Sequence, residues 1–132
     1  MRQLLAAMCV CLPGLAQAEP VVYVCDIDTG VTNGAFQSPL VIAYEAAERF
    51  VSVNDALIQG VTGGPLLGEV VSENGQRIVF KWTVRNVRNN TGQQSTMSYR
   101  ATISKGEGKL QVSMRPLQYD NSFNATGSCQ IE

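Results

Sequence analysis

Histidine is absent from the 132-residue chain, and cysteine is scarce, with four residues in all. Without histidine the chain lacks the commonest general base and the commonest metal ligand, so Ser-His-Asp and Cys-His catalysis are excluded. The sequence also lacks a phosphate-binding P-loop, a dinucleotide fingerprint and an EF-hand pattern. It therefore predicts a protein that is not an enzyme, binds no cofactor and holds no metal ion.

Charge is also scarce and nearly balanced, with 10 Lys and Arg residues against 11 Asp and Glu residues. A dedicated nucleic-acid-binding domain carries a large excess of basic residues, which this chain does not have. We therefore expect no nucleic acid among its partners.

Long apolar runs are limited to one stretch, Leu4–Leu15, which follows the positive charge of Arg2. A membrane-spanning helix needs about 20 apolar residues, and Gln17 and Glu19 end this run too early. Ala16-Gln17-Ala18 fits the small-x-small pattern of a signal-peptidase site. The sequence predicts a signal peptide over residues 1–18 and a single exported domain, periplasmic or secreted, over residues 19–132. We expect no membrane span in that domain.

Cleavage after Ala18 would remove Cys9 and Cys11 and leave Cys25 and Cys129, which lie near the two ends of the remaining chain. An even number of cysteines in an exported chain indicates a disulfide. The alternative is two unpaired, buried thiols. A Cys25–Cys129 disulfide would set the first and last strands side by side, as in a sheet that closes on itself.

The remainder of the chain alternates apolar and polar residues with the period of a β-strand that has one solvated face. The pattern predicts an all-β domain of seven to eight short antiparallel strands, which form a small barrel or, alternatively, a sandwich. We favour the barrel because the disulfide can join its ends. The one helix candidate is a short turn at 45–49, and the expected strands are 21–27, 40–44, 50–58, 66–72, 77–87, 96–104 and 109–115.

Asn74-Gly75 is the strongest hairpin signal, because both residues adopt the positive φ of a two-residue turn. With that turn, Glu69 pairs with Phe80 and points inward among aromatic residues, where a carboxylate marks a ligand cavity. The alternative is a bulge at Gly68 that turns Glu69 outward. An inward Glu69 together with Asp55 would allow a carboxylate-based hydrolase, which is one functional hypothesis.

Acidic residues gather before residue 76, and basic residues gather after it. Strand alternation places the bases on the outer face of three successive strands, interleaved with Ser98, Thr102, Gln111 and Ser113. Such a face can bind an anion or an acidic partner, or its bases can pair across strands with acids from the first half. The bases on this face are Arg77, Lys81, Arg85, Arg100, Lys109 and Arg115.

Tyr23-Val24-Cys25 opens the domain, a second cysteine closes it, and residues 72–77 read Ser-Glu-Asn-Gly-Gln-Arg. In these features the chain resembles the MliC/PliC inhibitors of C-type lysozyme, which are small exported β-barrels. The family loop reads Ser-Ala-Ser-Gly-x-Arg-Tyr, so the match covers Ser72, Gly75 and Arg77, whereas Ile78 stands in place of the tyrosine. The resemblance implies a hairpin that enters the lysozyme cleft and contacts its acidic residues.

The leading hypothesis is an exported, non-enzymatic binding domain whose partner is a protein or an anionic ligand in the export compartment. The lysozyme inhibitor and the Glu69/Asp55 hydrolase are the alternatives. The candidate binding residues are Ser72, Gly75, Arg77, Lys81, Arg85, Arg100 and Arg115.

Overall fold

The computed structural model describes residues 19–30, 34–88 and 91–132, so the predicted signal peptide at 1–18 lies outside the described residues. Eight strands and one short helix follow one another along the chain. They are β1 (Val21–Ile27), β2 (Leu40–Glu45), β3 (Phe50–Asn54), α1 (Ala56–Thr62), β4 (Leu66–Glu73), β5 (Arg77–Arg88), β6 (Gln94–Ser104), β7 (Lys109–Pro116) and β8 (Phe123–Ile131).

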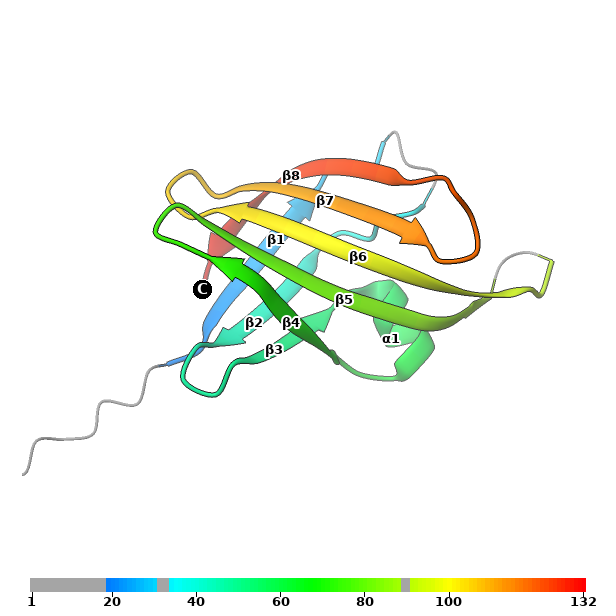
Figure 1. Ribbon diagram of the computed structural model, residues 1–132, viewed down its shortest axis with the longest axis horizontal. Helices are drawn as coiled ribbons and strands as arrows, with labels where there is room; N and C mark the ends of the chain where they lie inside the picture. Colours follow the sequence, from blue (N-terminus) through cyan, green and yellow to red (C-terminus); the bar gives the residue numbers. More distant parts are fainter. Residues whose placement is uncertain (1–18, 31–33, 89–90) are drawn as a thin grey trace, which may run out of the picture.

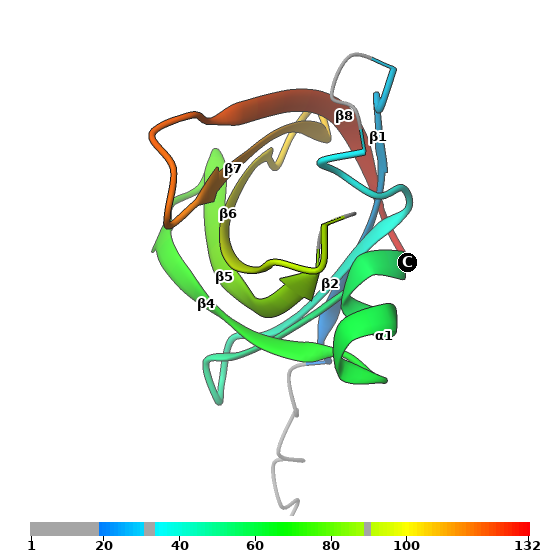
Figure 2. The same ribbon diagram turned by 90° about the vertical axis from the view of Figure 1, so that its right-hand side faces the viewer.

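Each strand pairs antiparallel with the next one in the sequence, and β8 returns to pair with β1, so the sheet is a closed barrel. Figure 2 shows the strands as a ring, and Figure 1 shows β4 to β7 side by side along one wall. The predicted all-β fold is confirmed, and the barrel rather than the sandwich is correct.

Because successive strands run in opposite directions, alternate connections lie at the same end of the barrel. The turns β2–β3, β4–β5 and β6–β7 share one end, which we call the hairpin end. The connection that contains α1 lies at the opposite end together with β5–β6 and β7–β8 (Figure 1), and we call this the helix end.

The barrel interior is filled with side chains from alternate positions of every strand. On β5 the expected inward set Ile78, Phe80, Trp82 and Val84 is buried, and the inward residues of β6 and β7 are buried or partly buried. Burial of a large apolar side chain stabilises the fold by roughly 1.5–3 kcal/mol. The core contains several aromatic contacts: Tyr23 and Tyr44 each pack against Phe80 in a T-shaped arrangement, and Trp82 stacks on Tyr99 with ring centroids 5.4 Å apart.

The predicted disulfide is present between Cys25 and Cys129, which are 104 residues apart in the sequence. The two cysteines are direct register partners across β1 and β8, the pair of strands that closes the barrel. The bond therefore ties the ends of the fold together at the seam of the sheet.

The expectation for residues 50–58 is wrong in its second half, because β3 ends at Asn54 and the chain turns into α1. Asp55 begins this helix as its N-cap, and its carboxylate accepts a hydrogen bond of 2.8 Å from the backbone N–H of Ile58. The helix candidate at 45–49 is instead the turn between β2 and β3. Within the described ranges, no helix is both long enough and apolar enough to cross a membrane.

Candidate functional site

The outward side chains of β5 to β8 form rows that run across the strands, because the β5–β6 register is continuous over residues 77–84 and the registers of β6–β7 and β7–β8 are continuous throughout. One row contains Lys81 on β5, Arg100 on β6, Ser113 on β7 and Asn124 on β8, each opposite the next. The row on its hairpin-end side contains Val79, Thr102, Gln111 and Thr126, and the row on its helix-end side contains Thr83, Ser98 and Arg115. We call these rows, together with Arg77, the basic face.

Two like charges stand directly opposite each other at the centre of this face. Lys81 and Arg100 are register partners on β5 and β6, and both are exposed. Directly opposed like charges destabilise a sheet. On β4, Glu69 is the register partner of Lys81, but among the described residues the ion pairs are Lys105–Glu73 and Lys109–Glu107. Cross-strand pairing with acids therefore does not account for Lys81, Arg100, Arg77 or Arg115.

Arg100 borders three hollows on the basic face. The first, of about 520 Å³, runs over β6, β7 and β8, includes Gln111, Ser113 and Asn124, and is bordered on its far side by the acid Asp28, which follows β1. The second, of about 400 Å³, shares Ser113 and Asn124 with it and adds Lys81 and Arg115. The third, of about 290 Å³, lies between β4, β5 and β6 and is lined by Ser72, Asn74, Arg77, Val79, Arg100 and Thr102.

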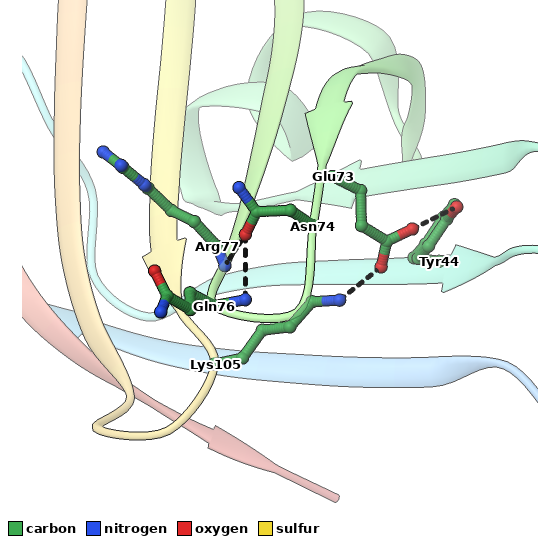
Figure 3. Close-up of polar contacts among 6 residues, drawn as sticks. All are labelled: Tyr44, Glu73, Asn74, Gln76, Arg77 and Lys105. Atoms are coloured by element: carbon green, nitrogen blue, oxygen red, sulfur yellow. Dashed lines mark hydrogen bonds and ion pairs between the residues drawn. The ribbon is translucent and has the colours of Figure 1, made fainter.

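The β4–β5 hairpin turns one residue later than the sequence predicts. The backbone N–H of Asn74 donates to the carbonyl of Arg77, so Gly75 and Gln76 form the tip, and neither Asn74 nor Gly75 has a positive φ. The side-chain oxygen of Asn74 accepts hydrogen bonds of 2.8 Å from the N–H groups of both Gln76 and Arg77 (Figure 3). Asparagine thus begins this turn instead of occupying its centre.

Glu73, beside that turn, is an exposed residue whose carboxylate is bound by two other side chains of the protein. Its carboxylate lies 2.7 Å from the Lys105 ammonium and accepts a hydrogen bond of 3.2 Å from the Tyr44 hydroxyl. The hydrogen bond from Lys105 holds the pKa of Glu73 below its ordinary value, and burial raises the pKa of Tyr44. Figure 3 shows Arg77 pointing away from this cluster, along the outside of the sheet.

Of the two orientations expected for Glu69, the inward one is wrong and the outward one, caused by a bulge, is correct, although the bulge does not lie at Gly68. A bulge between Val70 and Ser72 shifts the β4–β5 register, so Val70 rather than Glu69 faces Phe80, and Glu69 is exposed. Asp55 is the N-cap of α1, and burial raises its pKa. The two carboxylates of the hydrolase hypothesis therefore do not meet inside the barrel.

The other predicted site residues divide between the basic face and its margins. Ser72 lies opposite Val79 rather than Arg77, and Gly75 lies at the hairpin tip. The regular β5–β6 register ends at the pair Val84 and Met97. Arg85 follows at a second bulge and lies outside the rows.

The strand pattern of the sequence did not indicate the β8 part of the face, Asn124 and Thr126. The available signal was the alternation of Phe123, Ala125, Gly127 and Cys129, which are partly buried while the residues between them are exposed.

Within the part of the chain that the structure describes, His, Cys, Asp and Glu side chains form no cluster of three or more that could hold a metal ion. The polar groups available for chemistry are instead the guanidinium, ammonium, hydroxyl and amide groups of the basic face. This set can hold an anion by charge and hydrogen bonds. Comparisons with protein-family models, with curated proteins and with solved structures found no match to the chain.

Proposed function

We propose that the protein is an exported, non-enzymatic binding domain whose basic face holds an anionic partner. The observation that carries this proposal is the opposed pair Lys81 and Arg100, exposed and without an ion pair to any described residue. An anion placed between them would turn a repulsive contact into a favourable one.

Support also comes from the hydrogen-bonding groups around this pair. The side chains of Arg100, Thr102 and Ser113 make no hydrogen bond or ion pair with any described residue. A partner can therefore reach their donors and acceptors without first breaking a contact within the protein. Exposed charges at such a surface also speed association with an oppositely charged partner.

Binding to immobilised dextran sulfate at low and physiological salt tests the proposal. The purified protein should bind, and binding should weaken as salt rises because exposed charges are screened. Arg100→Glu reverses one charge at the centre of the face and should weaken binding by about tenfold or more. Arg85→Glu makes the same change outside the rows and should have a clearly smaller effect. Equal losses in the two variants, or no binding by the parent protein, would contradict the proposal.

A second candidate function is inhibition of C-type lysozyme through the 72–77 hairpin. It is favoured by Arg77, which is exposed beside the tip and makes no ion pair with a described residue. Glu73, the acid at this hairpin, is engaged by Lys105.

Titration of C-type lysozyme with the protein at physiological salt tests this candidate. If Arg77 is a true anchor, Arg77→Ala should cost about 2 kcal/mol of binding, a roughly thirtyfold loss of affinity. Absence of inhibition at micromolar protein would end the candidate, while inhibition unchanged by Arg77→Ala would move the site elsewhere.

A further inference from the structure

The smallest hollow on the basic face has the most specific set of polar groups. Arg77 and Arg100 border it on either side of the cross-strand row Ser72, Val79 and Thr102. Val79 faces outward but is only 7% exposed, so it forms an apolar base between the polar groups. The hollow therefore offers two guanidinium groups and two hydroxyl groups around one small volume of about 290 Å³.

These groups suit an oxyanion carried on a hydroxylated molecule. A guanidinium presents a planar set of donors that matches a carboxylate, phosphate or sulfate. Ser72 and Thr102 can each donate and accept, which matches neutral hydroxyl groups beside the acid. No described residue occupies the side-chain hydrogen-bonding groups of Ser72, Thr102 or Arg100.

The rest of the face favours a sugar polymer over a protein partner. Protein interfaces are centred on aromatic and aliphatic anchors. The exposed large apolar residues of the described chain lie elsewhere: on β3 and β4, in the β7–β8 connection and at the end of β8. Around Arg100 the rows instead present Thr102, Gln111, Ser113 and Asn124.

The same composition disfavours single-stranded nucleic acid. Proteins that bind it stack its bases on aromatic side chains, and the outward positions of these rows contain none. A polymer that combines regularly spaced acid groups with many hydroxyl groups matches both the charges and the hydroxyl and amide side chains.

We infer that the basic face binds an acidic polysaccharide and that the hollow between Arg77 and Arg100 receives one of its acid groups. This inference rests on the proposed function and names the class of its ligand. The polymer would extend from that hollow along the Arg100, Ser113 and Asn124 row, where the two larger hollows adjoin.

Titration calorimetry with matched polymers tests the inference. Polygalacturonate carries carboxylates and hydroxyls, polyglutamate carries carboxylates without hydroxyls, and dextran carries hydroxyls without charge. Per carboxylate, polygalacturonate should bind about tenfold more tightly than polyglutamate at equal salt, and dextran should not bind. Dextran sulfate shows whether the acid group can be a sulfate, and a single-stranded oligonucleotide represents the nucleic-acid alternative.

Variants locate the site. Arg77→Gln and Arg100→Gln should weaken the binding of both acidic polymers, whereas Arg85→Gln serves as the matched control outside the rows. Ser72→Ala with Thr102→Val removes the two hydroxyls without changing charge and should reduce the preference for polygalacturonate to about threefold or less. Circular dichroism checks that each variant is folded.

The outcomes separate this inference from the proposed function. Equal affinity for polygalacturonate and polyglutamate would overturn the polysaccharide and leave the anion-binding face. Tighter binding of the oligonucleotide would also overturn the polysaccharide. Failure of every anionic polymer to bind would overturn both the inference and the proposed function.

Discussion

At the scale of single residues, the two acids of β4 behave differently because of what each one contacts. Glu73 forms an ion pair with Lys105 and accepts a hydrogen bond from Tyr44, whereas Glu69 is exposed opposite Lys81 without an ion pair. Glu69 thus does not neutralise Lys81, although the two residues are register partners. A bound anion can therefore still act on Lys81 and Arg100.

Replacement of Glu73 by Gln tests the hairpin-end cluster. The pKa of Glu73 lies below its ordinary value of 4.5, chiefly because Lys105 donates a hydrogen bond to it. A depressed pKa contributes stability that is present above pH 4.5 and is lost as the pH falls through the folded-state pKa. The Glu73→Gln variant should be less stable at pH 7 by about 0.5–1 kcal/mol, and this difference should shrink in acid. Urea unfolding between pH 2 and pH 7 measures both effects.

Glu107→Gln is the control for this prediction, because the Glu107–Lys109 pair is solvent-exposed, with 66% and 76% of the two side chains accessible. We expect it to change stability by no more than a few tenths of a kcal/mol. A Glu73→Gln curve parallel to that of the parent protein at every pH would contradict the assigned role of Glu73.

Gly127 is a position at which the fold requires glycine. It lies on β8 between β1 and β7, and an added Cβ would collide with the backbone carbonyl of Asp26. Gly127→Ala should therefore destabilise the protein by about 2 kcal/mol or more, since neither neighbouring strand can move without breaking pairs. Gly75→Ala, at the exposed hairpin tip where a Cβ meets nothing within 4 Å, should cost far less. Thermal unfolding of the two variants gives the comparison.

At the scale of elements, α1 is short and depends on its ends. The helix has seven residues, Asp55 caps its start, and Gly63 ends it in the left-handed conformation at φ 75°. A helix of this length is marginal by itself, so the cap and the burial of Ile58 hold it in place.

Asp55→Ala should destabilise the protein by about 1 kcal/mol, because the N–H of Ile58 loses its hydrogen-bond acceptor. Asp55→Asn retains a side-chain oxygen that can cap the helix, so we expect it to retain most of the stability. Urea unfolding distinguishes the two, and equal losses in both variants would mean that the negative charge of the carboxylate, not the capping oxygen alone, stabilises the helix at this position.

The strand pattern of the sequence predicted most elements because one face of nearly every strand is buried. It failed where apolar alternation ran on from a strand into a helix, as at Leu57 and Ile58. Asp55 followed by Ala-Leu-Ile and, after the helix, by Gly63 was the capping signal that marked the change.

The site was only partly predictable. The outward bases of β5 to β7 followed from alternation, whereas alternation left the face of Glu69 open, because one bulge reverses the face of the residues on its far side. Sequence alone cannot place such a bulge when the residues around it, such as Val70 and Val71, suit either face. Asn124 and Thr126 were missed because β8 contains Gly127 and polar residues that lower its strand signal.

At the scale of the whole molecule, the disulfide joins the same two strands, β1 and β8, whose pairing closes the sheet. Among the eight strands that the structure describes, closure of the barrel leaves no edge strand, and exposed edges are the usual template for aggregation. The Cys25–Cys129 bond secures the β1–β8 pair on which this closure depends.

Removal of the disulfide should cost between about 2 and 5 kcal/mol, since the loop it closes is long and the unfolded chain gains freedom. The double variant Cys25→Ala with Cys129→Ala and the reduced parent protein should both unfold at lower urea than the oxidised parent. Mass spectrometry should first show the oxidised protein to be two hydrogens lighter than the reduced form. Identical urea midpoints with and without reductant would contradict a stabilising role for the bond.

The Cys25–Cys129 bond has a further consequence for the connectivity of the chain. The bond closes the polypeptide between the two cysteines into a covalent ring. A protease that nicks one exposed turn of this ring, such as the β6–β7 turn at Gly106, would open the ring without releasing a fragment. The nicked molecule would remain one species on a gel until reductant separates it into two pieces.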